Sequence, residues 1–162
     1  MIPQKECVIR AMTVADIPAV IDIERRSFTT PWTLHAFRME MKNQLAVYRV
    51  AETDGIISAY GGMWLILDEA HVTNVAVHPD YRGRHLGRRI MEALMEEALR
   101  RNLLRMTLEV RKQNEPAIAL YKKLGFLMAG IRPGYYQDTG EDALIMWVEL
   151  TAKDEKPGTE EQ

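Results

Sequence analysis

The sequence of 162 residues contains a single cysteine, Cys7, which excludes an internal disulfide and zinc sites built from cysteine pairs. It has no apolar run near the 18 residues typical of a membrane-spanning helix, and its first ten residues, MIPQKECVIR, contain no apolar signal region. Neither sign of charge is in large excess, since the net charge is −2, and this argues against wholesale nucleic-acid binding. We therefore expect a cytoplasmic protein that binds neither membranes nor nucleic acid.

The composition is otherwise that of an ordinary globular protein, with 47% hydrophobic and 27% charged residues. This length can bury one core, and we predict a single domain over residues 1–150. Residues 151–162 carry mostly charged and polar side chains with little to bury, so we predict a flexible charged tail there. The histidines show no ligand spacing, and we expect no metal.

Hydrophobic periodicity and turn residues predict an alternation of strands and helices. Asp54-Gly55 is a strong hairpin signal between two strands, and Pro79 ends a strand because it cannot donate to a ladder. The predicted strands span residues 7–13, 45–52, 56–67, 69–77, 104–110, 126–137 and 142–150. The predicted helices span residues 14–28, 34–41, 86 to about 98, and 115–126. This order predicts an α/β fold with a mixed, mostly antiparallel central sheet flanked by helices.

The stretch VAVHPDYRGRHLGRRI, residues 75–90, places glycines and arginines between a predicted strand and a predicted helix. The first amides of a helix lack internal partners and carry partial positive charge, so they can bind an anion. Gly83 and Gly87 would let the backbone approach a ligand, and the arginines are suited to phosphate oxygens. An exposed turn with solvated arginines would have the same sequence. Neither the Walker pattern nor the dinucleotide pattern G-x-G-x-x-G is present.

Together with LEVRKQNEPAIALYKKLGF, residues 108–126, this stretch resembles the GNAT acetyltransferases, which use acetyl-coenzyme A (acetyl-CoA). The resemblance covers roughly residues 6–150 and implies the GNAT fold. The pyrophosphate loop of that family, [Q/R]-x-x-G-x-[G/A], matches residues 82–87 with His85 at the first glycine position. That loop binds phosphate mainly through main-chain amides, so an outward-pointing His85 would be tolerated. The cofactor-binding residues implied by the resemblance are Val75, Val77, Arg82, Gly83, Arg84, His85, Leu86, Gly87, Arg88 and Asn114.

Glu109 is the candidate general base, because it interrupts an apolar strand and the matching family position has that role. Strand parity places it opposite Met106 and Leu108, which is equally compatible with a solvent-facing carboxylate. Tyr121 matches the family tyrosine that protonates the departing thiolate, although a tyrosine at this spacing is commonly a core residue. Asn114 could also be an ordinary helix N-cap. With Cys7 far from the motif, the resemblance implies direct transfer without an acyl-enzyme.

The segments SFTTPWT, residues 27–33, and RPGYYQDTGEDALIM, residues 132–146, are similar to the RimI-type N-α-acetyltransferases. These enzymes acetylate the N-terminal alanine of a small-subunit ribosomal protein. The similarity implies that Trp32, Tyr135 and Tyr136 line the acceptor groove, although such aromatic residues often serve only packing. An α-amine has a pKa near 7.7–8.0 against about 10.4 for lysine, so a carboxylate acting through water suits an N-terminus better.

The resulting hypothesis is an acetyl-CoA-dependent transferase acting on a protein N-terminus as a monomer or weak dimer. Two alternatives remain open. One is a GNAT enzyme acting on a small amine or a lysine side chain, against which the tyrosine pair argues. The other is a non-catalytic acetyl-CoA-binding module, which would need neither Glu109 nor Tyr121.

Overall fold

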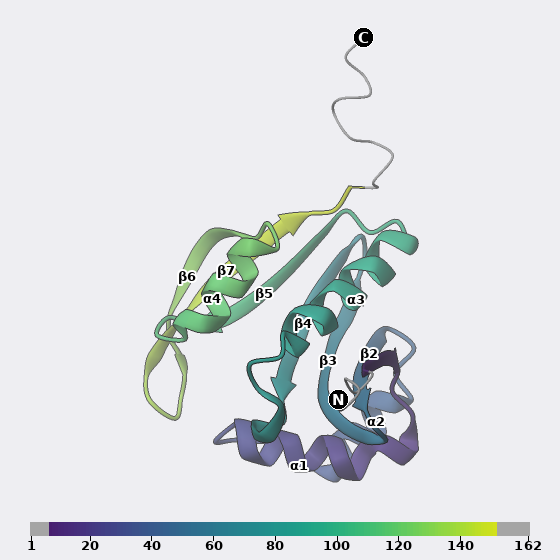
Figure 1. Ribbon diagram of the computed structural model, residues 1–162. Coiled ribbons are helices and arrows are strands. Elements are labelled where there is room, and N and C mark those ends of the chain that lie inside the picture. The colour runs from purple at the N-terminus through teal and green to yellow at the C-terminus, as the bar shows by residue number, and fades with distance from the viewer. Residues whose placement is uncertain (1–6, 152–162) are drawn as a thin grey trace, which may run out of the picture.

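The computed structural model describes residues 7–151, so the predicted charged tail beyond Thr151 lies outside the described residues. A seven-stranded sheet has the strand order β1-β2-β3-β4-β5-β7-β6, and helices flank it on both faces (Figure 1). The strands are β1 (Cys7–Ala11), β2 (Ala46–Thr53), β3 (Ile56–Ile66), β4 (Glu69–Val77), β5 (Arg105–Arg111), β6 (Leu127–Tyr136) and β7 (Glu141–Glu149). The α-helices are α1 (Ile17–Ser27), α2 (Leu34–Met41), α3 (Leu86–Arg100) and α4 (Glu115–Lys123).

These elements confirm the predicted order and fold class, but β1 ends at Ala11 rather than at residue 13, α4 ends at Lys123 rather than at residue 126, and the first helix begins differently. The predicted helix over 14–28 divides into a 3-10 turn at Val14–Asp16 and α1. Thr13 and Asp16 form a reciprocal capping box around that turn, and a proline occupies the first turn of α1, where its missing N–H costs no hydrogen bond. Asp54 and Gly55 have φ angles of +57° and +81°, as a tight hairpin turn with the twist of the sheet requires.

All neighbouring strands pair antiparallel except β4 and β5, which pair parallel. Their pairing joins Glu69–His71 with Arg105–Thr107 only. Since β4 continues to Val77 and β5 to Arg111, the two strands diverge beyond these residues (Figure 1). A gap therefore separates β4 from β5 in the middle of the sheet, at the carboxyl ends of these two strands.

A β-bulge at Thr73 changes which side chains of β4 face each side of the sheet. Val72 lies opposite Met63 and Asn74 lies opposite Gly62, so Thr73 is an extra residue in the ladder. Val72 packs in the core beneath α3, and beyond the bulge Val75 packs against that same core. Strict alternation would have placed residues 72 and 75 on opposite faces.

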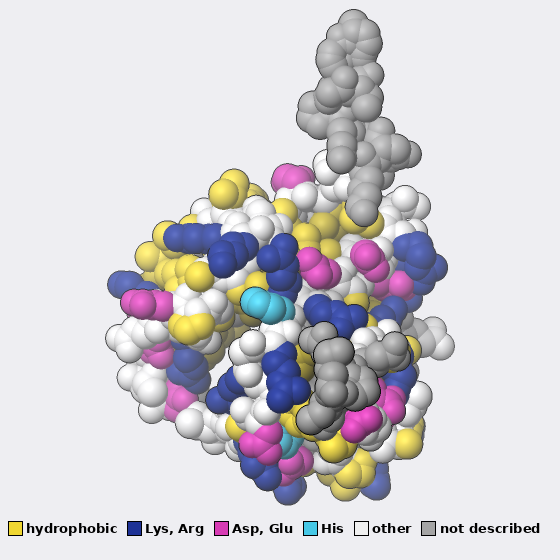
Figure 2. Space-filling model, in the orientation of Figure 1, with side chains coloured by type: hydrophobic (Ala, Val, Ile, Leu, Met, Phe, Trp, Pro, Cys, Tyr) yellow, Lys and Arg dark blue, Asp and Glu magenta, His cyan; other side chains and the backbone are white. Residues whose placement is uncertain are grey.

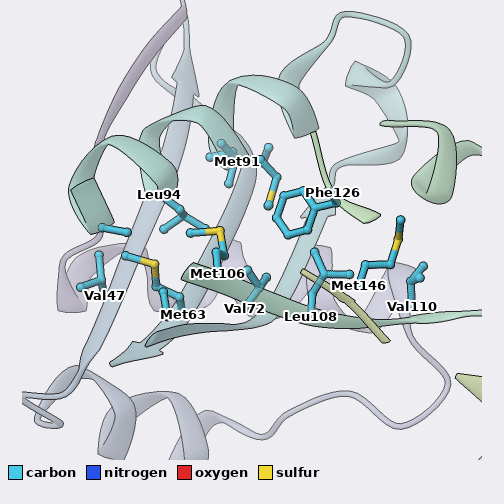
Figure 3. Close-up of a cluster of buried hydrophobic side chains, with 14 of the residues drawn as sticks. Val47, Met63, Val72, Met91, Leu94, Met106, Leu108, Val110, Phe126 and Met146 are labelled. Atoms are coloured by element: carbon cyan, nitrogen blue, oxygen red, sulfur yellow. The ribbon is translucent and has the colours of Figure 1, made fainter. Parts of the chain in front are cut away.

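Two hydrophobic cores lie on opposite faces of the sheet, since Val47 and Tyr48 are consecutive in β2 and belong to different cores. In the first, Met91 and Leu94 of α3 pack on side chains of the sheet such as Met106 (Figure 3). Side chains of α4 pack against this same core, and α1 and α2 cover the second. Within the described chain, no helix is long and apolar enough to cross a membrane.

Candidate active site

A cavity of about 740 Å³ lies where β4 and β5 diverge, between the start of α3 and the helix α4. Its volume is in the range of small-molecule and cofactor sites. Figure 2 shows a hollow on this face of the molecule, with Lys and Arg side chains beside it. The predicted site residues that line the cavity are Val75, Val77, Arg82, Gly83, His85, Leu86, Gly87, Arg88, Asn114 and Tyr121.

Arg84 is the predicted cofactor-binding residue that does not line this cavity. Its guanidinium instead stacks on the ring of Tyr81, with 5.0 Å between the guanidinium carbon and the ring centroid. Arg88 lines the cavity and also donates from Nε to the Glu92 carboxylate at 3.1 Å, one turn further along α3. Of these two arginines, only Arg88 is therefore placed to contact a ligand in the cavity.

The chain enters α3 through two left-handed residues, Gly83 with φ +82° and His85 with φ +62°. A glycine adopts this conformation freely, whereas a residue with a Cβ pays roughly 1–2 kcal/mol. The GNAT pattern has at the position of His85 a glycine, which would adopt this conformation without that cost; His85 itself is exposed and also lines the cavity. Among residues 7–151, the side chain of this N-cap residue does not bond the helix amides, so they remain available to an anion.

Gly87, predicted to let the backbone approach a ligand, has room for a Cβ as far as the protein is concerned. A Cβ at this position would meet the side chains of Leu120 at 3.7 Å and Val77 at 3.9 Å, which are ordinary contact distances. Within the described residues, nothing in the protein itself therefore requires glycine. Any such requirement would have to come from a ligand in the cavity.

Helix α4 brings Asn114 and Tyr121 to the cavity from the side opposite α3. The Asn114 side chain accepts a hydrogen bond from the backbone N–H of Ala117 at 3.3 Å, so it caps α4 as well as lining the cavity. The Tyr121 ring lies 5.8 Å from that of Phe126. Burial raises the pKa of Tyr121 to about 12, with a smaller contribution from Tyr136. The phenol thus carries its proton at neutral pH.

Glu109 lies on the face of β5 opposite the buried Met106 and Leu108, as strand parity predicts. Its Oε1 lies 2.9 Å from Nε2 of His71, and its Oε2 lies 3.5 Å from Nε of Arg132. The hydrogen bond with His71 lowers the pKa of Glu109 below its ordinary value and raises the pKa of His71 above its own. Its side chain is only 12% exposed, so Glu109 is not an ordinary solvent-facing carboxylate.

Sequence reasoning missed His71 as a partner of Glu109. The contact follows from the short parallel pairing in which His71 lies opposite Thr107, two residues before Glu109. Only that register between distant strands could have indicated the contact.

The predicted acceptor-side aromatic residues do not line the cavity: Trp32 lies between α1 and α2, a few residues after the lining residue Phe28, and Tyr135 and Tyr136 lie at the end of β6. The Trp32 ring packs 5.3 Å from that of Phe37, while the Tyr135 and Tyr136 rings meet edge to face at 5.0 Å. Burial raises the pKa of Tyr136 to about 12, and the negative charge of Glu109 contributes to that shift. Tyr136 therefore lies within electrostatic reach of both Glu109 and Tyr121.

Two polar clusters hold the segments that carry these aromatic residues. The Glu24 carboxylate is 2% exposed and accepts hydrogen bonds from the Trp32 backbone N–H at 2.9 Å, from Asn74 Nδ2 at 3.1 Å and from the Tyr60 hydroxyl. Its burial raises the pKa of Glu24. Arg111 donates to Asp138 and lies 4.0 Å above the Tyr136 ring. Sequence reasoning did not single out Arg111, whose partners lie across a distant turn.

These groups form a cavity with free helix amides and cationic side chains at one end, and a protonated phenol on its wall. A hydrogen-bonded carboxylate and imidazole pair lies on the neighbouring strands. Among the described residues, no group of three or more His, Cys, Asp and Glu side chains could hold a metal ion. The arrangement suits an anionic ligand and a proton-transfer reaction between an acceptor and a leaving group.

The chain matches the model of the Acetyltransferase (GNAT) family over residues 17–126. It is 46% identical over 143 residues to a Bacillus subtilis (strain 168) protein provisionally named as a [ribosomal protein bS18]-alanine N-acetyltransferase, covering 88% of this chain and 95% of that one. It is 38% identical over 140 residues to the [ribosomal protein bS18]-alanine N-acetyltransferase of Escherichia coli (strain K12), covering 85% and 94%. The crystal structure of the ribosomal-protein-S18-alanine N-acetyltransferase from Escherichia coli superimposes with a TM-score of 0.84 at 35% identity, covering 93% of this chain and 98% of that one.

Proposed function

The chain belongs to the GNAT acetyltransferase family and is an N-acetyltransferase, and on this basis we propose that its acceptor is the N-terminal alanine of ribosomal protein bS18. The observation that carries this proposal is the identity of 46% and 38% to two proteins named for that activity, over nearly the whole of each chain. The aligned length includes the segments that flank the acceptor end of the cavity. A ribosomal acceptor would place the reaction in the cytoplasm.

GNAT acetyltransferases use acetyl-CoA, and the volume of the cavity and its cationic lining residues Arg82 and Arg88 support this co-substrate. The free amides at the start of α3, with Arg82 and Arg88, would hold the pyrophosphate. The backbone near Val75 and Val77, where β4 has parted from β5, would receive the pantetheine arm. Bound there, acetyl-CoA supplies an activated acetyl group beside Tyr121.

The chemistry requires a neutral amine, a proton acceptor and an acid for the departing thiolate. In this proposal Glu109 takes the proton of the α-ammonium, directly or through one water, and Tyr121 gives its proton to the thiolate sulfur. The pKa of Tyr121, about 12, keeps the phenol protonated at neutral pH, so its proton is present when the carbon–sulfur bond breaks. Cys7 lies on β1, at the edge of the sheet remote from β5, which favours direct transfer to the amine.

The acceptor end would be formed by Trp32, Tyr135 and Tyr136, positioned by the clusters around Glu24 and Arg111. The pKa of an α-ammonium is about 2.5 units lower than that of a lysine side chain, so its deprotonation at a given pH costs about 3.5 kcal/mol less. A partly buried carboxylate such as Glu109 is therefore a better match for an α-amine than for a lysine side chain.

The test is release of CoA from acetyl-CoA with a short peptide carrying the N-terminal alanine sequence of bS18. The matched control is the same peptide with a blocked N-terminus and a free lysine. We expect turnover with the first peptide only. Turnover with the blocked peptide would indicate a lysine acceptor, and silence with both while acetyl-CoA still binds would reject the proposed substrate.

A further inference from the structure

Glu109 alone is poorly matched to the proton that it must accept. The ordinary pKa of a glutamate carboxyl is about 4.5, and the hydrogen bond with His71 lowers the pKa of Glu109 further only while the imidazole carries its proton. A protein α-ammonium has a pKa of about 7.7–8.0, more than about three pKa units higher. A carboxylate with so low a pKa would hold the proton only as a rare, high-energy species, whereas general-base catalysis is most efficient when the pKa of the base is near the working pH.

His71 lies where it can correct this mismatch. Its Nε2 is 2.9 Å from Oε1 of Glu109, while Oε2 of the same carboxylate lies 3.5 Å from Arg132. The imidazole is 31% exposed and the carboxylate 12% exposed, so the inner group of the pair is Glu109 and the outer group has access to solvent. The two side chains are fixed by neighbouring strands rather than by a loop, because β4 and β5 pair at His71 and Thr107.

The charged groups around His71 come from three strands. Glu109 on β5 and Glu69 on β4 raise its pKa, whereas Arg132 on β6 and partial burial lower it, with the hydrogen bond to Glu109 as the largest effect. The net result is a His71 pKa above the ordinary value of 6.5. The pKa of the imidazole is therefore nearer to the pKa of the α-amine than the pKa of the Glu109 carboxyl is.

We propose that His71 and Glu109 accept the proton as one unit, in which Glu109 contacts the acceptor and His71 Nε2 holds the proton. This inference rests on the proposed N-terminal acetylation, and His71 is a positioning residue because it acts on the acceptor only through Glu109.

Two protons leave the α-nitrogen in the whole reaction. One passes to Glu109, then to neutral His71, and from there to solvent. As the nitrogen forms its bond to the acetyl carbon and the carbon–sulfur bond breaks, the thiolate takes the Tyr121 proton, and the second proton of the nitrogen restores the phenol.

The kinetic test compares the wild-type enzyme with His71→Gln, which retains a hydrogen-bond donor but cannot hold a proton. We expect a loss in kcat of about 100-fold near pH 7, with KM unchanged for both substrates. The loss should shrink to a few-fold near pH 9.5, where the α-amine is already neutral in solution. A loss of equal size at every pH, or none near pH 7, would overturn the proposal. His35→Gln, at an exposed position on α2, is the matched control and should retain wild-type kinetics.

A second measurement tests, without any turnover assay, whether His71 and Glu109 are coupled. The His71 ring is titrated by NMR in the wild-type protein and in Glu109→Gln. We expect the imidazole pKa to lie above 6.5 in the wild type and to be lower in the variant, since a neutral amide cannot stabilise the imidazolium. An identical titration in both proteins would refute the pair, even if the ribosomal peptide proved to be the wrong substrate. A coupled titration together with an inactive peptide would instead reject only the proposed acceptor.

Discussion

The hydroxyl of Thr29 donates a hydrogen bond to Oδ2 of Asp138, joining two segments 109 positions apart in the chain. Thr29 follows α1, and Asp138 lies in the turn between β6 and β7. Asp138 is also paired with Arg111 at the end of β5, at 2.9 Å. The segments that carry Trp32 and Tyr136, the residues proposed to bind the acceptor, are thus connected through side chains.

Asp138→Ala should raise the KM for the acceptor peptide, because it releases Thr29 and Arg111 together. We expect roughly a tenfold rise, less than the 100-fold that a 1 Å displacement of a reacting group can cost. Steady-state kinetics with the peptide varied at saturating acetyl-CoA measures it. Thr29→Ala is the milder control, since the pair of Asp138 with Arg111 remains. An equal rise in the KM for acetyl-CoA would show that these residues do not act on the acceptor side.

His85→Gly should stabilise the protein by about 1 kcal/mol, because glycine adopts the left-handed conformation of this N-cap without steric cost. The free energy of unfolding from urea titration measures the change. Arg84→Gly is the matched control: residue 84 is not among the residues with positive φ, so glycine there should destabilise by roughly 0.5–1 kcal/mol. A loss of stability in His85→Gly would mean that the histidine side chain has a compensating role.

The elements around His85 illustrate what the sequence could predict. Leu86, Ile90, Leu94 and Ala98 repeat at helical spacing, and all four are buried on one side of α3. The alternation in β5 likewise predicted that Glu109 lies opposite Met106. These are local patterns, set by the geometry of one helix or one strand.

Two features of the site could not be predicted because they depend on distant strands. The bulge at Thr73 reverses the parity of β4 and turns Val75 toward the core beneath α3, and no residue type at that position signals it. The contact of His71 with Glu109 depends on a parallel register of three residues between β4 and β5. The resemblance to GNAT enzymes predicted a set of residues most of which line one cavity, whereas the partners of Glu109 and Arg111 could be identified only from the fold.

The pair of His71 and Glu109 should make stability depend on pH in a defined window. Its contribution is fully present above the unfolded pKa of Glu109, about 4.5, and below that of His71, about 6.5. It is lost as the pH rises through the raised pKa of folded His71, or falls through the lowered pKa of folded Glu109. Thermal melts should therefore show His71→Gln destabilised by on the order of 1 kcal/mol at pH 5.5 and hardly at all at pH 9. A deficit that is largest at pH 9 would contradict this assignment of charge.

Tyr121→Phe should lower kcat by about 10²-fold or more while leaving the KM for acetyl-CoA nearly unchanged. The ring still packs on Phe126, so the fold is kept, and only the proton for the thiolate is lost. Stopped-flow detection of released CoA gives the rate. Tyr81→Phe removes a hydroxyl from a residue that does not line the cavity and should leave kcat unchanged. Wild-type turnover in Tyr121→Phe would assign the acid to another group.

The proposed acceptor of this N-acetyltransferase is the α-amine of the N-terminal alanine of bS18. This proposal is tested by incubating intact bS18 with acetyl-CoA and the enzyme and locating the acetyl group by tandem mass spectrometry. We expect one acetyl group per chain, on the N-terminal alanine, and none in a parallel reaction with Glu109→Gln at neutral pH. Acetyl groups on lysine side chains, or an unmodified N-terminus despite bound acetyl-CoA, would contradict it.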